Sequence, residues 1–136
     1  MITVDEMKGD YDWRNAWAYA GHRESTSEYL ITPEPQVMAV DEDTSTNTFG
    51  LEDLDHLIGA DWGINDERDW VCAGRLKDGR WFFLSAGCDY TGWGGSATVV
   101  ASRTQLLTMG MRKEEAARMG LQGEREFLLL QQEKAP

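Results

Sequence analysis

The residue types best suited to binding or chemistry gather in residues 87–96. This segment combines a thiol at Cys88, a carboxylate at Asp89, a phenol at Tyr90 and an indole at Trp93 with four glycines. Glycine lets a backbone turn sharply or approach a ligand closely, so we expect a loop here. Because Tyr and Trp dominate binding hot spots, we predict that this loop binds a partner through the four side chains. The alternative is that the two rings cover the end of a sheet.

An enzymatic function would use the same loop differently. It would make Cys88 a nucleophilic thiolate that His22 or His56 activates and Asp89 orients. No spacing in the sequence supports this arrangement, because neither histidine is tied to the loop and a neighbouring carboxylate disfavours a thiolate. We therefore expect Cys88 to be a small packing residue and assign no catalytic residue.

Negative charge is concentrated in the first half of the chain. Residues 1–69 carry a net charge of −13 and residues 70–136 a net charge of +2, within a total of −11. Such a field repels nucleic acid and anionic membranes and attracts basic partners. We therefore expect a protein partner of basic character, without direct binding to nucleic acid or membranes. The predicted partner-binding surface includes the acidic run Asp41, Glu42 and Asp43.

A second function follows from the same charge. Carboxylates on a rigid surface could imitate a phosphate backbone and occupy the basic groove of a DNA-binding or RNA-binding defence protein. Competition between this protein and DNA for a common partner, relieved by salt, would distinguish such mimicry from other protein binding.

Two acidic patterns resemble metal sites incompletely. The oxygen-bearing side chains in residues 41–52 fit several positions of a calcium loop, but Thr46 stands where the sharp turn needs glycine. Glu52 and His56 would share one face of a helix and could together hold a metal ion. The chain has only 2 histidines, however, which argues against a zinc enzyme. We assign no metal and no other cofactor, and calcium binding by residues 41–52 stays an open alternative.

The length and composition predict one soluble domain. A chain of 136 residues with 41% hydrophobic content can form a single compact domain over 1–136 with its own core. It contains no run of about 18 apolar residues and does not begin with a signal peptide, so we expect a cytoplasmic protein. The 2 cysteines are expected to be free thiols in that compartment.

The first half of the chain predicts helices and short strands. Residues 10–21 have apolar side chains at the helical period, with Trp13 and Trp17 on one face. Residues 28–32 and 36–40 are suited to strands, and the polar residues 41–48 to a loop. A helix should follow at 48–58, capped by Thr48 and apolar along one side.

The second half predicts a meander followed by helices. Asp78-Gly79 between the apolar runs 70–76 and 81–86 indicates a tight hairpin, and residues 97–101 would form a third strand. A two-residue turn would set Cys72 opposite Ser85 and keep it about 10 Å from Cys88, beyond disulfide reach. Three helices should follow, at 102–110, 111–119 and 123–134; their expected features are a Ser102 cap, a Gly120 stop, and a buried face of Phe127, Leu128 and Leu130.

Together these elements predict an α+β fold. Its core would be a three- to five-stranded antiparallel sheet, with a meander at 70–101, packed on one face by the N- and C-terminal helices.

The segment from Asp78 to Trp93 also resembles small uncharacterised proteins of bacteriophages and prophages. The resemblance covers residues 70–101 and rests on three shared features: an Asp78-Gly79-Arg80 turn, an apolar strand, and a Cys88-Asp89-Tyr90-Thr91-Gly92-Trp93 segment. It implies a phage-encoded protein that acts in the bacterial cytoplasm, and it implies no catalytic residue. Combined with the charge, it suggests a non-enzymatic binding protein for a host or phage protein.

Overall fold

The computed structural model describes residues 2–20 and 49–134. Its centre is a four-stranded antiparallel sheet with the strand order β1-β2-β3-β4. The strands are β1 (Leu54–Asp61), β2 (Trp70–Leu76), β3 (Trp81–Asp89) and β4 (Gly92–Val100). The helices are α1 (Val4–Gly9), α2 (Tyr11–Ala20), η2 (Leu51–Asp53), α4 (Arg103–Gln105), the π-helical η3 (Leu106–Gly110), α5 (Lys113–Arg118) and α6 (Gln122–Lys134). The predicted α+β class with an antiparallel meander is confirmed.

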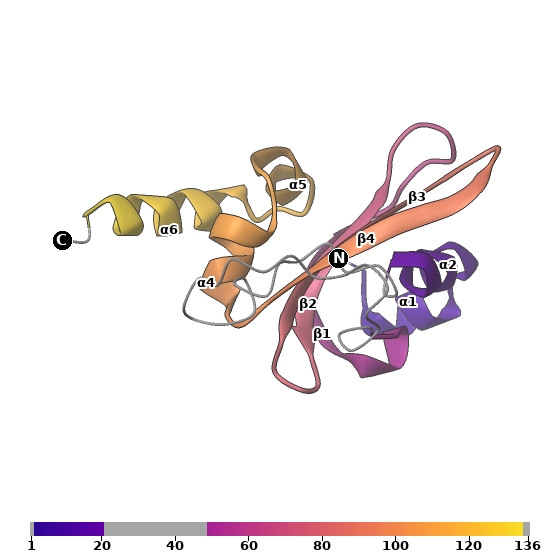
Figure 1. Ribbon diagram of the computed structural model, residues 1–136, viewed down its shortest axis with the longest axis horizontal. Helices are drawn as coiled ribbons and strands as arrows, with labels where there is room; N and C mark the ends of the chain where they lie inside the picture. Colours follow the sequence, from indigo (N-terminus) through magenta and orange to yellow (C-terminus); the bar gives the residue numbers. More distant parts are fainter. Residues whose placement is uncertain (1, 21–48, 135–136) are drawn as a thin grey trace, which may run out of the picture.

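The helices cover both faces of the sheet, not one face as predicted. Figure 1 shows α1 and α2 on one side and α4, α5 and α6 on the other. The reason lies in the central strands, which are apolar in both directions. Cys72 packs with Trp13 and Trp17 in one core cluster. Its neighbours Val71 and Ala73 pack with the C-terminal helices in a second cluster. Each face therefore needs its own helical cover.

The first core cluster forms around the tryptophans of α2. Trp17 is 1% exposed, and its ring lies 5.5 Å from that of Phe49 and 5.1 Å from that of Phe82, edge to face in both pairs. The Asp10 carboxylate accepts a hydrogen bond of 2.9 Å from the Trp13 backbone N–H, so it caps the first turn. The helix predicted over 10–21 is thus confirmed for its described part.

The helix predicted over 48–58 is wrong. Residues 51–53 form one 3₁₀ turn and residues 54–61 form β1, which pairs with β2. The register shifts twice, between Leu54 and His56 and between Leu57 and Gly59. A bulge adds one residue to the strand period of two. Leu54 and Leu57 therefore pack into the same cluster at a spacing of three, which imitates a helix in the sequence.

The predicted hairpin exists, but its register is shifted by one residue. Cys72 pairs with Leu84, not with Ser85. The turn contains three residues, because Leu76 N–H donates to Arg80 C=O at 2.8 Å and Gly79 has a φ of +96°. A glycine in this conformation adds a bulge to the hairpin turn. Both cysteines are free thiols, as predicted. Burial raises the pKa of the Cys72 thiol well above its ordinary value.

The C-terminal half confirms two predicted helix boundaries. The Ser102 hydroxyl accepts from the Gln105 backbone N–H at 3.1 Å, which caps α4. After α5, Gly120 has a φ of +75°, and Leu121 N–H donates to Ala116 C=O at 2.7 Å. These features define the glycine-terminated helix end that the sequence predicts.

The buried face predicted for the last helix is wrong. Phe127 and Leu130 are 59% and 52% exposed, and only Leu128 packs against the second core cluster. In Figure 1, α6 extends away from the sheet. One polar tie holds it near its beginning: the Arg103 guanidinium donates to both Glu124 carboxylate oxygens at 2.7 Å. No described helix is long and apolar enough to cross a membrane.

Candidate functional site

The segment predicted as a loop at 87–96 is mostly sheet. Strand β3 continues to Asp89 and β4 begins at Gly92, so that Cys88 pairs with Trp93. Two of the four glycines that suggested a loop, Gly87 and Gly95, instead allow close approach of neighbouring chain segments. A Cβ at Gly95, for example, would lie 2.6 Å from the Ser85 carbonyl oxygen. What remains of the loop is the turn at Tyr90 and Thr91.

This turn is built around the Asp89 carboxylate. Asp89 Oδ1 accepts a hydrogen bond of 2.8 Å from the Thr91 backbone N–H and a second, short one from the Thr91 hydroxyl. These bonds stabilise the charged form and lower the pKa of the Asp89 carboxyl below its usual value. The result is an ordered turn that holds Tyr90 94% exposed at the end of the hairpin.

The turn should therefore loosen in acid. A lowered pKa means that the carboxylate's contribution to the folded turn is complete above the ordinary aspartate value of 3.8 and is lost as the pH falls through the lower folded pKa. We expect the Thr91 amide NMR signal to titrate with a midpoint below 3.8. In the Asp89→Asn control this titration should be absent. A midpoint at or above 3.8 would contradict the role of Thr91.

Trp93 has a partly structural position. It is half-buried, and its ring lies 4.9 Å from that of Trp70, which is buried under the end of the sheet. Of the two predicted aromatic anchors, Tyr90 thus projects into solvent while Trp93 covers Trp70 with one face. The alternative in which the rings cover the sheet end applies to Trp93 but not to Tyr90.

A cleft lies between this hairpin and the connection from β1 to β2. Its volume is about 420 Å³, and it is lined by Ile64, Asp66, Glu67, Arg68, Asp69, Gly87, Cys88, Asp89, Thr91, Gly92, Trp93 and Gly94. Four of these residues carry carboxylates and one carries a cation. Sequence reasoning identified Asp89, but it missed Asp66, Glu67 and Asp69. Their only signal was the acidic composition of the connection, because its position beside β3 depends on strand pairing.

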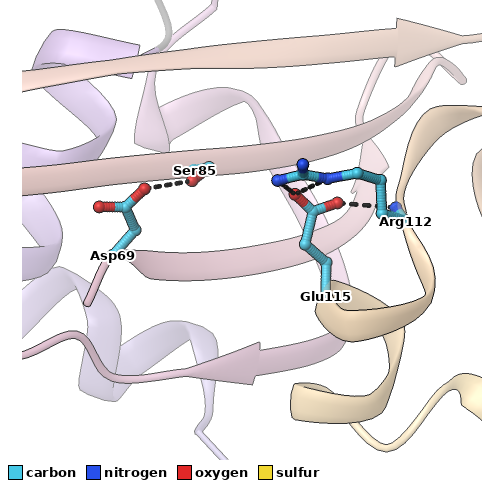
Figure 2. A network of polar contacts seen from close by, with 4 residues as sticks. All are labelled: Asp69, Ser85, Arg112 and Glu115. Carbon is cyan, nitrogen blue, oxygen red and sulfur yellow. Dashed lines mark hydrogen bonds and ion pairs between the residues drawn. The ribbon is translucent and has the colours of Figure 1, made fainter.

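A second hollow continues along the same face of the sheet. Figure 2 shows Asp69 beside Ser85, and the Ser85 hydroxyl donates a hydrogen bond of 3.1 Å to the Asp69 carboxylate. On the neighbouring helical layer, Arg112 is paired with Glu115. The hollow has a volume of about 340 Å³, and Ser85, Arg112 and Glu115 are part of its lining. Small polar side chains thus connect the acidic cleft to the base of α5.

The structure separates Cys88 from His56. The His56 ring contacts Trp81 at 5.7 Å, at the opposite end of β3 from Cys88. At about 3.3 Å per residue, these ends of the strand lie roughly 23 Å apart. His56 therefore cannot activate Cys88. The other candidate base, His22, lies outside the described residues.

Several further predictions fall outside the described residues. They are the acidic run Asp41, Glu42 and Asp43, the strands at 28–32 and 36–40, and most of the calcium-like segment. Glu52 and His56 do not share a helix, and His56 Nδ1 instead lies 2.7 Å from Asp55. In the described part of the chain, no three His, Cys, Asp or Glu side chains are arranged to hold a metal ion.

Comparison with protein-family models, with curated proteins and with solved structures finds no match for this chain.

Proposed function

We propose that this chain is a small binding protein that engages a basic segment of a protein partner at the acidic cleft. The observation that carries the proposal is the combination of an exposed tyrosine on an ordered turn with carboxylates from two separate segments beside it. Because Asp89 orders the turn before binding, little conformational freedom would be lost when a partner contacts Tyr90.

The charge of the cleft supports a basic partner. Asp66, Glu67 and Asp69 come from the connection before β2, and Asp89 comes from the hairpin. Only Arg68 offsets them among the lining residues. Lys or Arg side chains would meet these carboxylates at a surface that also offers the Trp93 ring, a favourable neighbour for a cation.

The phage resemblance suggests where the protein acts and which proteins it meets. A phage-encoded protein in the bacterial cytoplasm would meet host proteins or other phage proteins, so one of these is the proposed partner. A partner that itself binds nucleic acid is the narrower form of the proposal, because clustered carboxylates can compete with phosphates for the same basic groove.

The experiment compares two tyrosines. Immobilised wild-type protein is used to capture partners from bacterial lysate, and the affinity for a captured protein is then measured with purified variants. Tyr90→Ala is expected to weaken binding by roughly 30-fold or more, as at a hot spot. Tyr11→Ala is the control, because Tyr11 is 69% exposed on α2 and does not line the cleft.

Charge is tested in the same assay. The double variant Asp66→Asn, Glu67→Gln should weaken binding, and salt should weaken the wild-type complex more than that of the variant. Competition by DNA would support the narrower form of the proposal. Equal binding by wild type, Tyr90→Ala and the double variant would contradict the proposed site.

A further inference from the structure

The connection at 62–69 lies on the surface without a buried side chain. Trp62 and Ile64 are exposed, and the charged residues that follow them are exposed as well. Apolar contacts hold only the start of the segment, where Trp62 and Ile64 are 47% and 42% exposed and Gly63 lies against the Trp70 ring. Hydrogen bonds position the charged residues that follow. Besides the bond of 3.1 Å that the Asp69 carboxylate accepts from the Ser85 hydroxyl, they fall into two groups.

The first group holds both ends of the segment to one side chain. Arg118, the last residue of α5, donates from Nη2 to the backbone carbonyls of Trp62 at 3.2 Å and Asp69 at 2.9 Å. Its Nε donates to the Asp61 carboxylate at 3.1 Å. One guanidinium thus joins the end of β1 to the start of β2. Its three bonds tie the base of the segment to the C-terminal helices.

The second group is a single bond at the tip. The Asp66 N–H donates to the Cys88 carbonyl at 2.9 Å, across the cleft. Asp66 has a φ of +65°, in the left-handed region that aspartate and asparagine tolerate and β-branched residues disfavour. Ile64 and Arg68 exchange backbone hydrogen bonds of 2.9 and 3.0 Å, so the tip is a closed turn that can move as one piece.

We propose that residues 62–69 form a flap over the cleft, anchored at its base by Arg118 and latched at its tip by the Asp66–Cys88 backbone bond. Opening breaks the single tip bond and lets Asp66 leave its left-handed conformation, while the three Arg118 bonds persist. Opening widens the cleft for a ligand and increases the exposure of Cys88, which is half-buried while the tip bond is in place. This device is independent of which molecule binds in the cleft.

Hydrogen exchange tests the latch. Asp66→Val should raise the exchange rate of the residue 66 amide about tenfold, because a β-branched side chain disfavours the left-handed region. Asp66→Asn is the matched control: it removes the same charge, but asparagine tolerates this conformation, so the rate should stay near that of wild type. Wild-type exchange at the free-peptide rate, or equal rates in the Val and Asn variants, would overturn the latch.

Arg118→Ala tests the anchor. It should raise exchange at the amides of Ile64, Asp66 and Arg68 together, whereas Arg112→Ala, which removes an equal charge from the same helical layer, should not. The Leu121 amide, bonded to Ala116, reports whether α5 stays folded. Faster exchange at Leu121 to the same degree as at the flap would mean general loosening and would overturn a specific anchor.

Thiol labelling gives an independent readout of opening. Cys72 is fully buried, so a disulfide reagent such as DTNB should report mainly on Cys88, and Cys88→Ser supplies the blank. Labelling should accelerate about tenfold in Asp66→Val and not in Asp66→Asn. Equal labelling rates in wild type, Asp66→Val and Arg118→Ala would show that the segment does not gate the cleft.

Discussion

Replacing Trp17 by alanine is expected to lower the free energy of unfolding by about 3–5 kcal/mol, the usual cost of removing a large buried ring. Trp17 contacts Phe49 and Phe82 edge to face and fills the centre of the first core cluster. The two rings come from β3 and from a position two residues before η2, so the cavity would not close by movement of one element. Urea denaturation followed by far-ultraviolet circular dichroism measures the loss.

Tyr19→Ala is the matched control for this variant. Tyr19 lies on the same helix as Trp17, but it is 48% exposed. Its removal should change the free energy of unfolding by about 0.5 kcal/mol or less, as is usual at the surface. Similar losses in the two variants would mean that α2 is stabilised by its own helix propensity instead of by the packing of Trp17.

Replacing Gly74 by alanine is expected to cost about 1–3 kcal/mol, although it adds only one methyl group. Gly74 pairs with Leu57 on one side and Phe82 on the other. A Cβ at this position would run into the backbone carbonyl of His56, and a strand backbone yields less easily than a side chain. The added methyl should push β1 away from β2 at its bulge.

Gly94→Ala provides the comparison within the same sheet. A Cβ at Gly94 meets nothing within 4 Å, so the change in unfolding free energy should be about 0.5 kcal/mol or less. Urea denaturation midpoints of the two variants and of wild type measure this difference in stability. If Gly74→Ala were as stable as Gly94→Ala, the close approach of β1 to β2 at this bulge would not exist in solution.

The two cores explain why the candidate site lies where it does. The cleft is at the end of the sheet where β3 and β4 extend past the helices, and its lining is polar. Its carboxylates therefore stay in contact with water, which avoids the cost of burying a charge. The same sheet end receives the C-terminal layer through Arg118, which connects the cleft to the second core.

Local chemistry made several features predictable from the sequence. The Trp13 and Trp17 face of α2, the Asp78-Gly79 turn, the Ser102 cap and the Gly120 stop each depend on residues within one or two turns of chain. The antiparallel meander followed from apolar runs separated by short turns. The sequence also drew attention to Asp89 and Tyr90, and their binding role stays a prediction.

Features that depend on partners far apart in the sequence were not predictable. A bulge gave β1 the spacing of a helix, and one extra turn residue shifted the hairpin register. Phe127 and Leu130 have the composition of a buried face but find no cover in the described chain. The amino-acid sequence alone therefore determined the fold class and the turn positions, since both depend on local pattern.

Only the tertiary structure decided that the connection at 62–69 lies across from the hairpin. Strand pairing places Asp69 beside Ser85, and the Asp66 N–H then reaches the Cys88 carbonyl. Arg118, 49 residues beyond Asp69, closes the base of the flap. Residues so far apart in the chain are brought together by strand pairing and by the packing of α5 on the second core cluster, and their spacing in the sequence does not reveal this contact.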